Sequence, residues 1–68
     1  MTKYGEWVKL KRKEKGLTLE QLAIKSGTGK SQIWEIENTN ANPRLSTLIN
    51  ISSGLGVKLT YSLKKAGY

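Results

Sequence analysis

The stretch that decides the fold is Leu17–Glu37, LTLEQLAIKSGTGKSQIWEIE, which predicts two short helices joined by a tight turn. Apolar residues recur at helical spacing on both sides of Gly27, which stands where a sharp bend is expected. Thr18 and Gln21 form a T-x-x-Q capping box, a pattern that starts a helix by satisfying exposed backbone N–H groups. The expected helices cover residues 18–26 and 30–37.

The chain on either side of this pair is also predicted to be mainly helical. Residues 4–15 have apolar side chains at four-residue spacing, and Gly16 suits the left-handed position that ends a helix. Residues 38–43, NTNANP, are rich in turn-forming Asn and Pro and predict a loop. A fourth helix is expected to begin near Arg44. We expect its inner face to carry Leu45, Leu48, Ile49, Ser52 and Leu55.

The length and composition limit the classes of protein to which the chain can belong. Its 68 residues correspond to one small domain. It has no cysteine and no histidine, which argues against a thiolate or histidine metal site and against histidine-dependent catalysis. We therefore expect neither an enzyme nor a bound cofactor or metal. No apolar run is long enough for a membrane span or a signal peptide.

The charge balance indicates the kind of partner. Twelve Lys and Arg residues against five Glu residues give a formal net charge of +7. Such an excess on a small domain indicates an anionic polymer or surface. Charge alone does not distinguish DNA from RNA or anionic lipid as the partner. The two helices expected over residues 18–26 and 30–37 favour DNA. In a helix-turn-helix, the second helix is presented to the DNA major groove while the first braces it, so the sequence predicts binding to double-stranded DNA.

The second helix of the pair is expected to read bases. Ile33 and Ile36 define its buried side, and polar side chains opposite them in its N-terminal half are placed to meet base edges. Lys donates to guanine, Ser bonds to several base edges, and Glu accepts from cytosine. The candidate base-reading residues are Lys30, Ser31, Trp34 and Glu35.

Helix ends and loops around this reader are expected to bind the phosphate backbone. Such contacts fix the register of a protein on DNA without reading the sequence. Thr28 and Gly29 would contribute backbone N–H groups. The other candidate phosphate or minor-groove residues are Gln32, Asn38, Asn40, Asn42 and Arg44.

The period of the sequence changes after residue 56. Apolar Val57, Leu59, Tyr61 and Leu63 alternate with polar residues, which is the spacing of a β-strand. A lone strand would lack a backbone partner in a helical chain, so we expect it to pair with the same strand of a second copy. The alternative is a short fifth helix that packs sideways. The predicted fold is thus an all-α four-helix DNA-binding domain over residues 1–57, with a C-terminal dimerisation strand and tail over residues 58–68.

The sequence resembles the phage-repressor/Cro (XRE-type) family of helix-turn-helix proteins. The residues that carry the resemblance are Arg12, the GLT-x-x-x-LA run of Gly16–Ala23, Gly27, Ile33, the IEN of 36–38, Pro43, and the L-x-x-L-x-x-I-x-x-x-L-G-V of Leu45–Val57. The alternating C-terminal segment resembles that of HipB-type antitoxins, whose last residues form a strand shared between subunits.

This resemblance implies roles for individual residues. It places base contacts at Lys30, Ser31 and Glu35, a position near the phosphates at Gln32, and a minor-groove contact at Arg44. It also implies a partly buried structural ion pair between Arg12 and Glu37. Family members are sequence-specific DNA-binding proteins, usually dimers on palindromic operators.

The sequence therefore predicts a cytoplasmic, bacterial or phage-encoded repressor that is associated with the nucleoid. We expect it to be autoregulatory and to bind a palindromic operator as a homodimer. One alternative is an antitoxin that represses its own operon, and another is a protein-interaction module without specific DNA binding. A toxin or an antirepressor protein would be a further partner.

Overall fold

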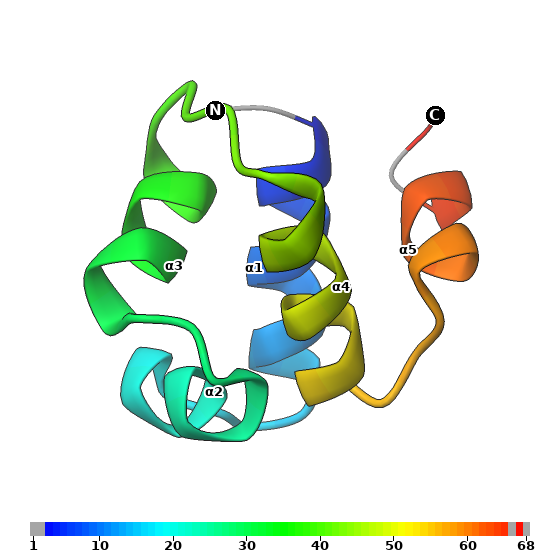
Figure 1. Ribbon diagram of the computed structural model, residues 1–68. Coiled ribbons are helices and arrows are strands. Elements are labelled where there is room, and N and C mark those ends of the chain that lie inside the picture. Colours follow the sequence, from blue (N-terminus) through cyan, green and yellow to red (C-terminus); the bar gives the residue numbers. More distant parts are fainter. Residues whose placement is uncertain (1–2, 66, 68) are drawn as a thin grey trace.

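The computed structural model describes residues 3–65 and 67, which form five helices (Figure 1). The helices are α1 (Lys3–Glu14), α2 (Leu19–Ser26), α3 (Lys30–Asn38), α4 (Leu45–Gly54) and α5 (Leu59–Lys65). The bounds predicted for the first three helices, and the start of the fourth, are confirmed to within one residue. Over the described residues, every helix falls short of the length and apolar content that a bilayer crossing requires.

The α2–α3 pair follows the local chemistry of its sequence. The Thr18 hydroxyl oxygen accepts from the Gln21 backbone N–H at 3.1 Å, and the Thr18 backbone N–H donates to the Gln21 side chain at 2.8 Å, so the capping box is present. Gly27 ends α2 at φ 69°, a left-handed conformation that favours glycine. The chain is extended at Gly29, and α3 begins at the next residue.

The core lies between α1, α2, α3 and α4. Its side chains are at most 3% exposed: Tyr4, Val8, Leu22, Ile33, Ile36, Ile51 and Leu55. A polar contact also enters this interior, because the Tyr4 hydroxyl lies 3.1 Å from the Ser52 hydroxyl and joins α1 to α4. Helices α1 and α2 both pack against α3, on whose inner side Ile33 and Ile36 are buried.

The orientation of α4 differs from the prediction. Leu45 and Ile49 were expected on its inner face, but they are 62% and 48% exposed. Thr47 and Ile51 are buried instead, whereas Ser52 and Leu55 are buried as predicted. Two of the five predicted inner positions, Leu45 and Ile49, therefore face solvent. Polar contacts with α1 and the close approach of Gly54 to α2 set the rotation of this helix.

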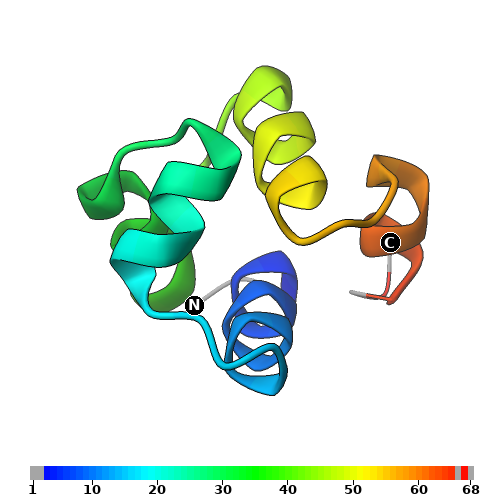
Figure 2. The same cartoon turned by 90° about the horizontal axis from the view of Figure 1, so that it is seen from below.

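The C-terminal strand prediction is wrong, because residues 59–65 form helix α5 and the described residues contain no strand. The HipB-type resemblance of this segment is not supported either. A helix satisfies its backbone groups within one chain, whereas a lone strand requires a partner. The fifth helix that we kept as an alternative is what forms. It packs against α1 and α4, on the side of the molecule away from α3 (Figure 2).

Candidate nucleic-acid interface

Helix α3 has one buried side and one solvent-facing side. Ile33, Ile36 and Glu37 are buried on the first. All four predicted base-reading residues are exposed: Lys30, Ser31, Trp34 and Glu35. The structure thus brings these four side chains together on one helix surface, where an incoming polymer could touch them without any rearrangement of the core.

An ion pair holds α3 against α1. The Arg12 Nε and Nη2 groups donate to the two carboxylate oxygens of Glu37 at 2.8 and 3.0 Å. The third contact is from Nη1 to the Leu17 carbonyl at 2.7 Å, in the segment that leads into α2. The hydrogen bonds to Glu37 raise the pKa of Arg12 above its ordinary value, and burial opposes them only in part. The guanidinium therefore stays charged wherever DNA binding is measured.

The C-terminal end of α3 is closed by its own side chains. The Thr39 hydroxyl and backbone N–H both donate to the Glu35 carbonyl, at 2.7 and 2.8 Å. The Asn38 amide donates to the Trp34 carbonyl at 2.9 Å, and its oxygen accepts from the Lys9 ammonium at 3.4 Å. Asn38 was predicted to bind phosphate, and the structure shows that its side chain already links α3 to α1.

The two phosphate ligands predicted at the N-terminal end of α3, Thr28 and Gly29, lie in different surroundings. Thr28 is 7% exposed, and its backbone N–H donates to the Ser26 hydroxyl at 3.3 Å. Gly29 is exposed and, having no side chain, provides no side-chain cap for α3. The first-turn N–H groups of α3 thus receive no cap from this residue, and such groups favour an anion.

The remaining predicted phosphate ligands flank α3 on the other side from α1. Gln32, Asn40, Asn42 and Arg44 are all exposed. An open hollow between α3 and the start of α4 is lined by Gln32, Glu35, Ile36, Ala41, Asn42, Pro43 and Arg44. Arg44 occupies the position just before α4, with extended backbone. Arg44 therefore places a positive charge beside α3, on the side of this hollow.

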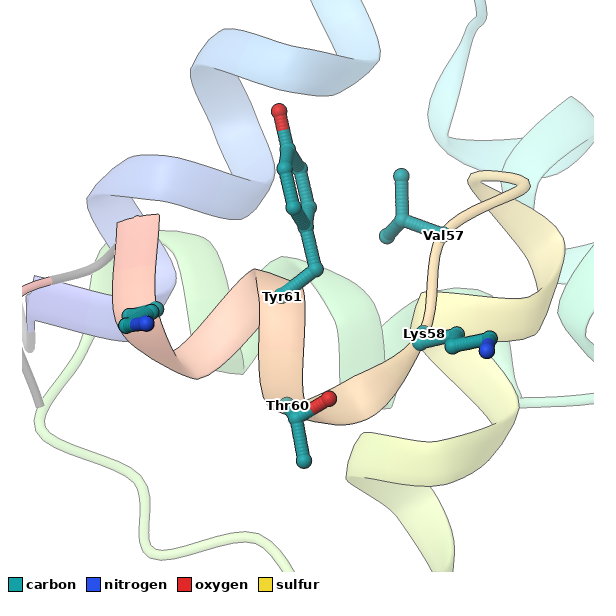
Figure 3. A pocket seen from close by; sticks show the side chains of 5 residues that line it. Val57, Lys58, Thr60 and Tyr61 are labelled. Carbon is teal, nitrogen blue, oxygen red and sulfur yellow. The ribbon is translucent and has the colours of Figure 1, made fainter.

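The predicted dimerisation residues are placed differently from one another, although Val57 and Tyr61 line one hollow with Lys58, Thr60 and Lys64. Val57 and Leu63 are partly buried against the chain's own core. Tyr61 is 46% exposed, and Figure 3 shows it pointing from α5 toward α1. The side chain of Leu59 lies outside the described part of the chain.

The chain belongs to the helix-turn-helix family. The family model matches residues 8–62. The chain is 39% identical over 56 residues to the immunity repressor protein of Bacillus phage phi105, and 41% identical over 56 residues to the transcriptional regulator SinR of Bacillus subtilis. These matches cover 82% and 81% of this chain, but only 39% and 50% of the two relatives, so the chain spans half or less of their length.

Solved structures of similar size also match. The restriction-modification controller protein C.Esp1396I aligns with a TM-score of 0.85 at 32% identity, over 96% of this chain and 84% of that chain. The controller protein C.AhdI from Aeromonas hydrophila aligns with a TM-score of 0.83 at 26% identity, over 90% of this chain and 92% of that chain. The fold is thus similar to that of these two controller proteins.

Sequence reasoning missed two features of this surface. It assigned no role to Lys9, although the Lys9 ammonium contacts the Asn38 side chain at the end of α3. It also missed the role of Thr39 in ending α3. The only available signal for Thr39 was a hydroxyl residue four positions after Glu35, which is a spacing that permits a bond to that carbonyl.

Proposed function

We propose that this chain is a sequence-specific, double-stranded DNA-binding transcriptional repressor whose helix α3 enters the major groove. The observation that carries the proposal is the exposed polar side of α3, held in place by buried Ile33 and Ile36 and by the Arg12–Glu37 pair. Membership of the helix-turn-helix family and the similarity to a phage immunity repressor support it. A DNA partner would place the chain in the bacterial cytoplasm.

The roles of individual residues follow from their places on this surface. Lys30, Ser31 and Glu35 would bond to base edges, and Trp34 would contact a thymine methyl group or a sugar. Gly29, Gln32, Asn38, Asn40 and Asn42 would bind phosphates, and Thr28 would position Gly29 rather than donate its own N–H. Arg44 would approach the minor groove, where the negative potential is enhanced.

A second copy of the chain completes the proposal. One helix-turn-helix unit makes few base contacts, and such units commonly read two half-sites as a dimer. Leu45 and Ile49 lie four residues apart on the same side of α4, and both are exposed. Because large apolar side chains at this spacing favour burial, we assign the homodimer contact to this side of α4.

The antitoxin alternative loses its main support, because that support was the C-terminal strand. The test of the proposal is selection of bound duplexes from a random pool, followed by titration of the selected duplex and a scrambled one. Enrichment of a palindromic sequence, with the scrambled duplex at least 1,000-fold weaker as is typical of specific binders, supports the repressor. Failure of every duplex to bind below about 10 µM at low salt favours the protein-interaction module.

A further inference from the structure

Lys9 on α1 contacts Asn38 at the C-terminal end of α3, which brings its positive charge beside the proposed DNA-binding side of that helix. We propose that Lys9 binds a backbone phosphate on the α1 side of α3, as an additional DNA-contacting residue. The proposal rests on the DNA-binding function proposed above, and it adds α1 to the surface that touches DNA.

The first support is the place of the Lys9 ammonium group. It donates to the Asn38 side-chain oxygen at 3.4 Å, and the Asn38 amide donates to the Trp34 carbonyl at 2.9 Å. Lys30, Trp34 and Asn38 follow one another at four-residue spacing, which puts them on the same ridge of α3. The ammonium therefore lies at the C-terminal end of the ridge that carries the proposed base readers.

The second support is the chemistry of its partner. Within the described residues, the ion pairs of α1 join Lys11 to Glu14 at 3.6 Å and Arg12 to Glu37, and neither involves Lys9. Its amide partner is neutral, and the bond between them is exposed and long. A phosphate oxygen would give the ammonium a shorter, charge-assisted bond at little cost, because the amide can rebind water.

The third support is the arrangement of charge around α3. Arg44 borders α3 on the side of the hollow lined by Gln32 and Glu35, whereas Lys9 borders it on the side of α1. A major groove is likewise bordered by a sugar-phosphate backbone on each side. One cation on each flank would hold α3 centred in the groove, with Lys9 on the backbone at one edge and Arg44 at the minor groove beyond the other edge.

The test compares Lys9→Gln with Lys11→Gln, a matched control on the same helix. Lys11 lines a hollow with Trp7 and Tyr61 on the α5 side, and its 3.6 Å pair with Glu14, three residues along the same helix, adds little stability. Affinity for a random-sequence duplex is measured from 50 to 200 mM salt, because the slope counts phosphate contacts without requiring the operator. Lys9→Gln should lower the slope by about 0.9, so that the wild type loses about 3.5-fold more affinity over this range than the variant.

The slope of Lys11→Gln should equal that of the wild type. Lys9→Arg, which keeps the charge, should restore the wild-type slope. Equal slopes for Lys9→Gln and the wild type would overturn the proposal while leaving DNA binding intact. A wild type that binds no duplex would instead overturn the proposed function, and the role of Lys9 with it.

A second readout uses the absence of cysteine from the chain. A DNA-cleaving iron chelate attached to Lys9→Cys should cut the sugar-phosphate backbone of a bound duplex at a defined position. The same chelate at Lys11→Cys should cut weakly and at no preferred position. Equal cutting from the two sites would contradict a specific location of residue 9 beside the DNA.

Discussion

Arg12 and Glu37 join α1 to the end of α3 through two parallel hydrogen bonds of 2.8 and 3.0 Å, although 25 positions separate them in the chain. The Glu37 side chain is 1% exposed and that of Arg12 is 11% exposed, so the pair is almost entirely removed from water. A buried pair of this kind fixes geometry, because either charge alone would be unfavourable in the interior. It holds the reader helix at one orientation relative to α1.

Arg12→Met should lower the free energy of unfolding by about 3–5 kcal/mol, because it leaves the Glu37 carboxylate buried without its partner. Urea unfolding monitored by circular dichroism measures the change. The double variant Arg12→Met/Glu37→Leu, which removes both charges, should recover much of the loss. A loss below about 1 kcal/mol in the single variant would show that the pair does not hold the helices together.

The stability that Arg12 supplies should not vary across neutral pH. Its pKa is raised in the folded chain, so its contribution is complete below the ordinary arginine pKa and is lost only as the pH rises through the higher folded value. The arginine charge therefore contributes equally at pH 7 and pH 9. The wild type and Arg12→Met should differ in unfolding free energy by the same amount at both pH values. A difference that falls steeply over this interval would contradict the assignment.

Gly54→Ala should destabilise the fold by about 1–3 kcal/mol, although alanine is the better helix former. An added Cβ would lie 2.8 Å from the Ser26 Cβ and 3.0 Å from the Ser26 backbone, so α2 and α4 would have to separate. Thermal unfolding checks this, with Ser53→Ala on the exposed side of α4 as the control. An unchanged or higher melting temperature for Gly54→Ala would mean that the two helices do not meet at this glycine.

Lys30→Ala and Arg44→Ala should weaken DNA binding in different ways. Loss of Lys30 should cost about 1–3 kcal/mol at the base that it reads and relax the sequence preference there. Loss of Arg44 should weaken binding to all duplexes and lower the salt slope by about one. Titrations against the selected and the scrambled duplex separate the two effects. Identical behaviour of both variants on both duplexes would show that these roles are misassigned.

Ile49→Lys should weaken homodimerisation by tenfold or more, about 1.4 kcal/mol, because it places a charge on the exposed apolar side of α4. Sedimentation equilibrium measures the dimer dissociation constant. Asn50→Lys makes the same charge change at the next exposed residue and should have a smaller effect. If both variants dimerise as the wild type does, the contact between copies lies elsewhere.

The sequence was sufficient for the elements whose signals are local. The Thr18 capping box, Gly27 and the buried pair Ile33 and Ile36 are short-range patterns, and each is where the sequence predicted it. The inner side of α4 was not predictable in the same way, because contacts with other helices decide its rotation. Ser52 and Leu55 are buried as predicted, but Thr47 and Ile51 take the buried side in place of Leu45 and Ile49.

The segment from Val57 to Leu63 was ambiguous for a physical reason. Its apolar residues alternate like those of a strand, but Leu59 and Leu63 are also four apart, as on a helix. Over seven residues the two periods cannot be told apart, and the availability of backbone partners decides between them. The place of Lys9 beside Asn38 depends on tertiary packing alone, so no pattern within the sequence could reveal it.

Amide chemical-shift mapping with the selected duplex shows which part of the chain meets the DNA. If the exposed side of α3 binds the duplex, the largest shifts are expected at residues 29–35, smaller ones near residues 40–44, and almost none in α5. Unchanged shifts at residues 29–35, with saturation of binding elsewhere on the chain, would contradict binding through α3.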